Sequence, residues 1–213
     1  MSAAESMIAI RQKVTACKEC PLHLGRKNAV PGEGPVNARV MCIGEGPGQH
    51  ENEQGKPFVG QAGKFLDELL ASGGLKREEV FITNVVKCRP PSNRDPEPRE
   101  LAACRVYLDE QIALINPEII VTLGRFSMAR FIEGGRISQI HGRAHTVVGR
   151  TIITMYHPAA ALHQPALRGD LIKDFAHLKT FLNKDKELEL STPQTAAPAK
   201  VDDAPEPEQL SLF

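Results

Sequence analysis

The sequence predicts an α/β fold with three layers, in which a four-stranded parallel sheet lies between two layers of helices. Short β-branched runs with the length of buried strands recur at wide spacing, at residues 39–43, 80–83, 118–123 and 151–155. Segments with helical periodicity separate these runs, and this alternation favours parallel pairing. Glycine, Asn or His follows each run, or stands at its end, on the edge of the sheet where ligands of α/β proteins bind.

The helices around this sheet are predicted from the spacing of apolar residues. Three segments with helical spacing lie between the strands, at residues 62–71, 98–115 and 125–132. Two amphipathic segments near the ends of the domain complete the α/β/α arrangement, at about residues 3–15 and 168–182.

Charge and composition divide the chain into a body and a tail. The 213 residues contain 26 basic and 26 acidic side chains, so the formal net charge is zero. Residues 184–213 contain three Lys and seven acidic residues, which gives −4, and the other 183 residues therefore carry +4. Because apolar periodicity stops there, we expect one domain at residues 1–183 and a disordered acidic linker at residues 184–208.

The basic excess of the body lies in one stretch of sequence. Residues 121–150 contain five arginines and one Glu. Such a stretch suits phosphate contacts, and the ordinary alternative is a solvated basic face. The five are Arg125, Arg130, Arg136, Arg143 and Arg150.

The remaining composition narrows the class of protein. No run approaches the ~20 apolar residues that a membrane-spanning helix needs, and the start lacks the profile of a signal peptide. We therefore expect a cytoplasmic protein without a membrane partner. In a reducing compartment, five cysteines indicate metal binding, catalysis or burial rather than disulfides.

The cysteines include a pair with metal-ligand spacing. Cys17 and Cys20 form a CxxC pair, and Cys88 and Cys104 are the candidates for two further ligands. Cys42 lies inside an apolar run and is more simply a core residue. The alternative is four unrelated thiols, and spacing does not separate zinc from an iron-sulfur cluster.

Two motifs after the first strand indicate a site for a flat ligand. The glycines of residues 44–48 match a dinucleotide fingerprint poorly because Pro47 interrupts them, and they are expected to bring bare backbone against the ligand. Phe58 lies between turn residues, where its ring can stack on a planar base or belong to the core.

Polar side chains end the second and fourth strands. The amide of Asn84 offers a donor and an acceptor together, which matches the O4 and N3–H edge of uracil and opposes the edge of cytosine. The alternative is a turn-forming Asn. His157 precedes Pro158, which keeps it out of helical conformation; it can donate to a developing anion or be structural.

These motifs together closely resemble those of the family 4 uracil-DNA glycosylases, iron-sulfur enzymes of base-excision repair in bacteria and archaea. They are Cys17-x2-Cys20-Pro21, residues 44–48, residues 55–60, residues 83–91 and His157-Pro158. The resemblance runs from about residue 7 to residue 182. It implies an enzyme that hydrolyses the N-glycosidic bond of deoxyuridine in single- and double-stranded DNA, releasing uracil and leaving an abasic site.

The resemblance also implies residue roles. A 4Fe-4S cluster would be held by Cys17, Cys20, Cys88 and Cys104. Uracil would contact Glu45, Gly46, Pro47, Phe58, Asn84 and His157, with Glu45, Asn84 and His157 at the chemistry. Two departures stand out: Ala159 replaces a Ser found in many members, and residues 49–53 are less acidic than in many, which weakens the case for a contact by Glu51.

Three alternatives stay open at the level of sequence. A related DNA-crosslinking branch carries a covalent histidine after the second strand, and residues 85–100 contain no histidine. The broader-specificity family 5 enzymes usually lack the combination of Glu45 and Asn84. A noncatalytic iron-sulfur protein that binds nucleic acid is the third. Leu162 and Leu167 are candidates for a residue that wedges into the DNA stack.

The last five residues resemble a second known motif. Gln209, Leu210, Ser211, Leu212 and Phe213 are similar to the QLxLF peptide with which bacterial repair and replication proteins bind the polymerase sliding clamp. Leu210, Leu212 and Phe213 are apolar anchors on a polar tether. A fraying tail is the alternative. We therefore expect a nucleoid-associated monomer with two partners, uracil-containing DNA and the clamp.

Overall fold

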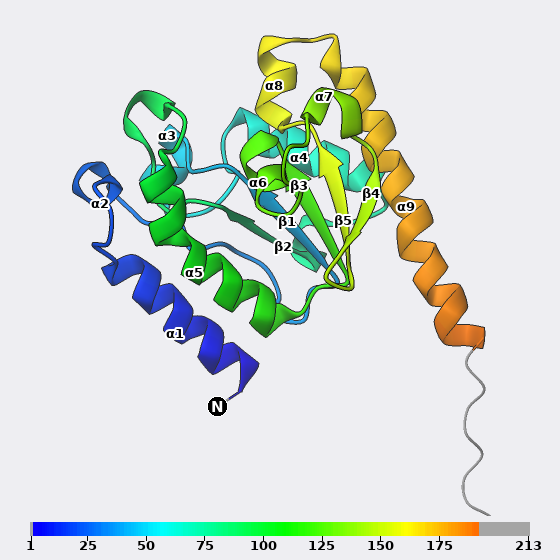
Figure 1. The fold of residues 1–213 in the computed structure, drawn as a ribbon, viewed down its shortest axis with the longest axis horizontal. Coiled ribbons are helices and arrows are strands. Elements are labelled where there is room, and N and C mark those ends of the chain that lie inside the picture. Colours follow the sequence, from blue (N-terminus) through cyan, green and yellow to red (C-terminus); the bar gives the residue numbers. More distant parts are fainter. Residues whose placement is uncertain (1, 192–213) are drawn as a thin grey trace, which may run out of the picture.

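The computed structural model describes residues 2–191, including the side chains of residues 2–182, and consists of a sheet between two helical layers (Figure 1). The strand order is β2-β1-β3-β5-β4. The strands are β1 (Val40–Gly44), β2 (Val80–Asn84), β3 (Ile119–Leu123), β4 (Ala144–Val147) and β5 (Arg150–Met155). All four predicted strands are present and parallel to one another, which confirms the α/β class.

The prediction of four strands omitted β4. This strand pairs antiparallel with β5 at the edge of the sheet. Its side chains alternate between exposed and half-buried and none is buried, so it lacks the apolar run that marks the other strands. Edge strands commonly carry such polar sequences, which discourage pairing with other chains.

Each predicted helix is present, and several short ones were not predicted. The expected helices are α1 (Ala3–Ala16), α4 (Gln61–Ser72), α5 (Pro98–Ile115), α6 (Arg125–Ala129) and α9 (Leu167–Ser191). The short helices and 3-10 turns are α2 (Leu22–Gly25), α3 (Gln49–Gln54), η1 (Arg77–Glu79), η2 (Pro91–Asn93), α7 (Ile137–Ile140) and α8 (Pro158–His163). Elements of this length show too few turns for apolar periodicity to reveal them. None of the described helices is long and apolar enough to span a bilayer.

The two predicted segments beyond the domain lie largely outside the described residues. Helix α9 continues to Ser191, past the boundary expected at residue 183. The remainder of the predicted linker and the predicted clamp-binding peptide at residues 209–213 are not described, so the division of the tail stays a prediction.

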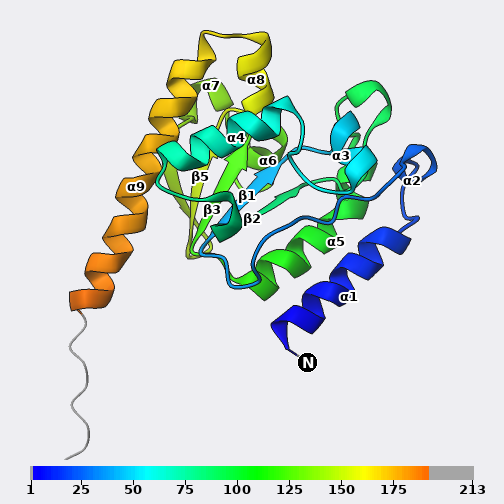
Figure 2. The ribbon, with the colours of Figure 1, turned by 180° about the vertical axis from the view of Figure 1, so that it is seen from behind.

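Alternate residues of the central strands face two separate cores. Val40 and Cys42 of β1 pack with α4 and α9, which cover the face seen in Figure 2. Met41 and Ile43 point the other way and pack with α1 and α5. Cys42 is fully buried, which confirms it as a core residue. Burial on both faces explains why these strands are continuously apolar.

Strand β2 is an edge strand whose outer side is partly covered by a segment near residue 33. Glu33 and Ile82 exchange backbone hydrogen bonds of 2.9 and 2.7 Å in an isolated antiparallel bridge. Further along, the N–H of Val30 donates to the carbonyl of Lys87 at 2.7 Å. The parallel strands deliver Glu45, Asn84, Gly124 and His157 to one edge of the sheet.

Candidate active site

A cavity of about 320 Å³ opens at the carboxyl ends of the parallel strands. It brings together all six residues for which a uracil contact is predicted: Glu45, Gly46, Pro47, Phe58, Asn84 and His157. Its wall also includes Glu51, Asn93 and Arg94. A larger hollow of about 510 Å³ lies at the opposite end of β1, beside Arg39 and Lys179, and contains none of the predicted site residues.

Asn84 presents an unpaired acceptor in this cavity. Its side chain is almost fully buried, and its Oδ1 has no hydrogen-bond partner among residues 2–182. A buried amide oxygen without a partner costs free energy, of the order of 1–3 kcal/mol. The atom is covered in this structure, and rotation of the amide toward the cavity would let a ligand N–H group reach it and remove that cost.

The glycines at the end of β1 and after it make room for side chains of the protein. A Cβ at Gly44 would lie 2.5 Å from Asn84 Oδ1 and 2.7 Å from Phe58 Cζ. At Gly48 it would lie 2.8 Å from Glu51 Oε2. Gly44 and Gly48 therefore allow neighbouring side chains to converge, and Gly46 and Gly48 also line the cavity, where contact of their backbone with a ligand stays a prediction.

Phe58 combines the two alternatives considered for it. The side chain belongs to the hydrophobic core and is 6% exposed, yet it also lines the cavity. Its ring lies 5.5 Å from the ring of His157, at an interplanar angle of 27°. Its backbone has φ of 50°, a left-handed conformation that is strained for an aromatic residue and is often found at functional sites.

The hydrogen bonding of His157 defines its chemical state. Its Nδ1 accepts the backbone N–H of Ala159 at 3.1 Å, so the proton of the neutral ring is assigned to Nε2. Burial lowers the pKa of His157 to about 4, although the nearby Glu51 carboxylate raises it slightly. The ring is therefore neutral near pH 7 and offers an N–H donor. A backbone amide provides this contact, so replacing the usual Ser with Ala159 does not remove it.

Two carboxylates differ in their roles at the cavity wall. Glu45 is half-buried, and its pKa is raised by desolvation and by Asp95, while Arg125 lowers it. Glu51 accepts three backbone N–H groups, from Gly48 at 3.1 Å, Val59 at 2.9 Å and Gly60 at 3.0 Å. Glu51 thus joins the loop after β1 to the loop that carries Phe58. Glu51 is the third residue of α3 and accepts from the N–H of the N-cap Gly48, which is one half of a capping box, and this spacing was the available sequence signal.

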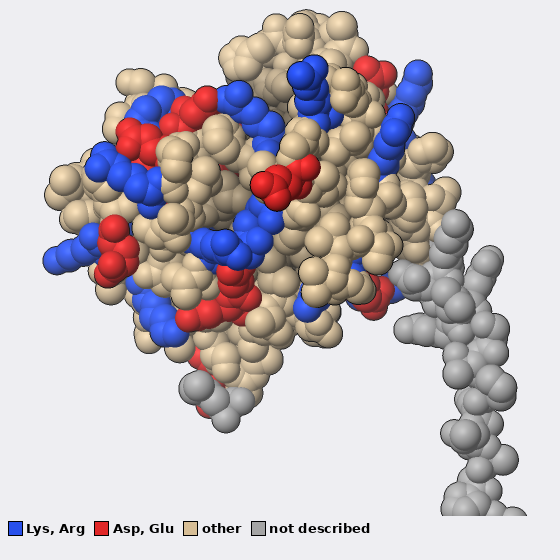
Figure 3. Space-filling view, in the orientation of Figure 1, with Lys and Arg blue, Asp and Glu red and all other residues tan. Residues whose placement is uncertain are grey.

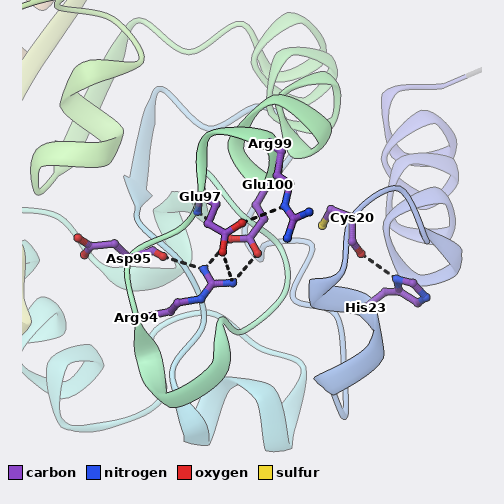
Figure 4. Close-up of polar contacts among 7 residues, drawn as sticks. All are labelled: Cys20, His23, Arg94, Asp95, Glu97, Arg99 and Glu100. Atoms are coloured by element: carbon purple, nitrogen blue, oxygen red, sulfur yellow. Dashed lines mark hydrogen bonds and ion pairs between the residues drawn. The ribbon is translucent and has the colours of Figure 1, made fainter.

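An ion pair between half-exposed Arg94 and buried Glu100 holds the opposite wall of the cavity (Figure 4). The guanidinium of Arg94 donates to both oxygens of Glu100, at 2.7 and 2.9 Å, and Glu100 is fully buried. Hydrogen bonding from Arg94 lowers the pKa of Glu100 despite its burial. The pair fastens the loop containing η2 to the start of α5. We did not predict it, because both residues occur in an ordinary charged, Pro-rich stretch.

The four candidate metal ligands come together beside this wall. Cys20, Cys88 and Cys104 are buried in one cluster with Tyr107, and half-buried Cys17 packs against them. Arg26 Nη1 donates to Cys88 Sγ at 3.1 Å, and the N–H of Lys87 donates to Cys104 Sγ at 3.3 Å. Burial, together with the smaller effect of the neighbouring thiols, raises the pKa of the Cys104 thiol to about 11, although the N–H of Lys87 lowers it.

These thiols fit a metal centre in chemistry but are not arranged around one. Soft sulfur donors with N–H groups directed at them are typical of iron-sulfur and zinc sites. However, no group of three or more His, Cys, Asp or Glu side chains in the described part of the chain is placed to hold a metal ion. Side-chain rotation would have to bring the sulfur atoms to a common centre.

The predicted cluster of arginines does not form one surface. Arg125 pairs with Asp95 and Arg130 with Asp109, whereas Arg150 lies at the start of β5, away from the cavity. Figure 3 shows basic and acidic side chains alternating over the face that carries α5. Neighbours in sequence are separated here because the chain folds through α6, α7 and a hairpin.

The α/β fold with a cavity at its strand ends is shared with a known family of enzymes. Residues 31–184 match the uracil DNA glycosylase superfamily, and the chain belongs to this superfamily. A type-4 uracil-DNA glycosylase of Thermotoga maritima is 42% identical over 186 residues, which cover 85% of this chain and 97% of the relative. One of Archaeoglobus fulgidus is 45% identical over 190 residues, covering 84% and 95%. A type-5 uracil-DNA glycosylase of Thermus thermophilus is 34% identical, over 70% of this chain and 85% of the relative.

Proposed function

We propose that the cavity at the ends of β1, β2 and β5 hydrolyses the N-glycosidic bond of deoxyuridine in DNA, by the type-4 reaction. The protein is a uracil-DNA glycosylase of base-excision repair, a monofunctional hydrolase, as its family membership and type-4 relatives indicate. The unpaired Oδ1 of Asn84 is the observation that carries the assignment of the site. The chain is 45% identical to a type-4 relative and 34% identical to a type-5 relative, which favours specificity for uracil over the broader specificity of family 5.

Asn84 reads the base. Uracil directs its N3–H to Oδ1 and accepts the amide N–H at O4, whereas cytosine has an acceptor at N3 and a donor at C4. Each mismatch would leave a buried polar group unpaired. The base must first leave the duplex, at a cost of a few kcal/mol that is smallest for mismatches and single strands. Phe58, beside His157, offers one face on which the base can stack.

His157 stabilises the leaving group. As the glycosidic bond breaks, negative charge develops on the uracil oxygens and positive charge on the sugar. The neutral ring donates its Nε2–H to an oxygen of uracil, and the backbone N–H of Gly46 can add to this stabilisation, whereas Pro47 has no N–H and that of Gly48 already donates to Glu51. Glu45 balances the sugar cation and positions the attacking water. A low pKa suits His157 to donate a hydrogen bond without transferring its proton.

The four thiols would hold a 4Fe-4S cluster. Cys17 and Cys20 belong to the N-terminal segment, Cys88 to the loop after β2 and Cys104 to α5. When bound, the cluster supplies a covalent connection among these three segments. Equimolar amounts of iron and acid-labile sulfide, together with broad visible absorbance, would support the 4Fe-4S cluster. A colourless protein that contains zinc would refute it.

The C-terminal peptide, residues 209–213, is proposed to bind the sliding clamp. The acidic tail would be repelled by DNA, which leaves the peptide free for a protein partner. Deletion of residues 209–213 should abolish clamp binding measured by surface plasmon resonance and leave excision from short oligonucleotides unchanged. Unaltered clamp affinity would reject this partner.

One gel experiment tests the activity. The purified protein is incubated with a single-stranded oligonucleotide that contains one uracil, and alkali then breaks the strand at any abasic site. Cleavage at the uracil, with none in matched cytosine and thymine oligonucleotides, supports the proposal. A bound but uncleaved oligonucleotide would indicate a noncatalytic binding protein, and a covalent adduct on a denaturing gel would indicate the crosslinking reaction.

A further inference from the structure

Lys87 is a buried cation that the proposed reaction does not use. Its side chain is 1% exposed, and it forms no ion pair within the described part of the chain. Its Nζ donates to Thr83 Oγ1 at 2.6 Å, to Gln111 Oε1 at 2.7 Å and to the carbonyl of Asn84 at 2.9 Å. Burying an ammonium without an opposing charge is costly, and these three acceptors satisfy its three N–H groups.

The position of the Asn84 carbonyl explains why a donor is needed there. Ile82 uses its outward N–H and C=O in the bridge to Glu33. Asn84 lies two residues further along β2, so its backbone N–H and C=O point to the same outer edge. The N–H of the next residue, Val85, points the opposite way and donates to the carbonyl of Gly44 in β1. Continuing the antiparallel register from Glu33 and Ile82 places Pro31 opposite Asn84.

Proline cannot complete this pairing because it has no N–H. The Asn84 carbonyl would therefore lack a donor at a position where the strand is buried. The Nζ of Lys87 supplies it. Pro31 contributes only its carbonyl, which accepts from Thr83 Oγ1 at 3.0 Å and from Gln111 Nε2 at 2.6 Å. The side chain of Lys87 thus replaces one missing hydrogen bond at the end of an edge strand.

This replacement matters because nothing else polar fixes the Asn84 side chain. Its Oδ1 is unpaired, so the direction of the amide depends on the backbone and on packing against Gly44 and Phe58. The backbone of Lys87 is itself held on both sides, by Val30 N–H and by Cys104 Sγ. The ammonium therefore extends from an anchored residue to the peptide that carries the base-reading amide.

We infer that Lys87 is a positioning residue for Asn84: its Nζ holds the carbonyl end of β2 in place of the N–H that Pro31 lacks, and thereby aims the Asn84 amide at uracil. The inference rests on the proposed role of Asn84. Lys87 touches no substrate and acts through the strand.

A double-mutant cycle tests the inference. Single-turnover kcat/KM for a uracil-containing single strand is measured for the full-length protein and for Lys87→Met, Asn84→Ala and both together. Lys87→Met should lower kcat/KM by roughly 10-fold or more in the wild-type background and by less than about 2-fold when Asn84 is already Ala. Visible absorbance of each variant shows whether the cysteine site is unaffected.

The outcomes separate positioning from a structural role. Equal losses in both backgrounds, or wild-type kcat/KM for Lys87→Met, would overturn the inference. Lys13→Met, on the exposed surface of α1 and paired with Glu110, is the matched control and should behave as wild type. Absence of excision by the wild-type protein would instead refute the proposed function.

A second variant covers the possibility that Lys87→Met does not fold. Gln111→Leu keeps the lysine and removes one of its three acceptors together with the contact to Pro31. It should lower kcat/KM by a smaller factor, roughly 3-fold, and this loss should again vanish in the Asn84→Ala background. An equal loss in both backgrounds contradicts the inference.

Discussion

The cavity and the cysteine cluster both use residues at or just after the end of β2, yet they differ in how far the chain alone fixes their polar groups. In the cavity, Asn84 Oδ1 is unpaired and Phe58 is held in a strained conformation, while the surrounding loops are fixed by Glu51 and by the Arg94–Glu100 pair. In the cluster, Cys88 and Cys104 already accept N–H donors, but the thiols are not placed around a metal. The cavity is therefore preorganised by the chain itself, whereas the geometry of the cysteine cluster would be defined by the proposed 4Fe-4S cluster.

The largest expected effect is on the unpaired group of the cavity. Asn84→Ala should lower kcat/KM for uracil excision by roughly 10³-fold, because it removes both base-reading hydrogen bonds. Unfolding by urea should show stability equal to or above that of the wild type, since a buried unpaired oxygen is removed. Full excision activity in Asn84→Ala would show that the unpaired amide of Asn84 is not needed for the reaction.

The second-largest effect on excision is expected for His157, the neutral hydrogen-bond donor of the cavity. His157→Ala should slow single-turnover excision by roughly 10²-fold. Activity of the wild type should not fall through protonation of His157 between pH 8 and pH 5, because burial lowers its pKa to about 4. A loss of activity with an apparent pKa near 6.5 that disappears in His157→Ala would show that the ring is not held neutral.

The same residue predicts a pH dependence of stability. The pKa of His157 is lower in the folded state than in the unfolded state, so unfolding takes up a proton between about pH 6.5 and pH 4. The free energy of unfolding is therefore highest, with respect to this group, above pH 6.5. It decreases by roughly 3 kcal/mol as the pH falls towards 4. Urea unfolding at pH 7 and pH 4.5 should show a larger decrease for the wild type than for His157→Ala. Parallel decreases would assign the effect to other groups.

Two cysteine variants separate the cluster from the core. Cys104→Ala should abolish the visible absorbance and destabilise the connection between the N-terminal segment and α5. Cys42→Ala, its matched control, should cost only about 1–2 kcal/mol for the small cavity and leave the absorbance unchanged. Retained iron in Cys104→Ala, measured by elemental analysis, would remove this residue from the ligand set.

The smallest of these effects concerns the ion pair in the cavity wall. Glu100→Gln should reduce stability by roughly 1–3 kcal/mol, because the Arg94 guanidinium loses a buried charged partner. We expect a modest rise in KM with little change in kcat, since the wall is loosened and the reacting groups remain. Arg105→Gln, which disrupts an exposed pair with Asp109, is the control and should change stability by less than about 0.5 kcal/mol. Equal stabilities of Glu100→Gln and the wild type would show that the pair does not hold the loop.

The sequence revealed what depends on local pattern. The four buried strands are apolar on both faces, so their runs were predicted with nearly correct limits, and β4 was missed because it buries no side chain. Asn84 and His157 were found because polar residues at strand ends are conspicuous. The Gly48–Glu51 spacing is a local signal, but the contact of Glu51 with Val59 and that of Lys87 with Gln111 depend on the fold, so no local pattern predicts them.

Base discrimination by Asn84 and its Asp variant tests the central claim most directly. Single-turnover excision from matched oligonucleotides with uracil or cytosine at one position gives a ratio of rates for each protein. The wild type should favour uracil by roughly 10⁴-fold or more, and Asn84→Asp should reduce that ratio by at least about 100-fold, because a carboxylate no longer donates to O4. An unchanged ratio in Asn84→Asp would show that the unpaired amide of Asn84 does not read the base.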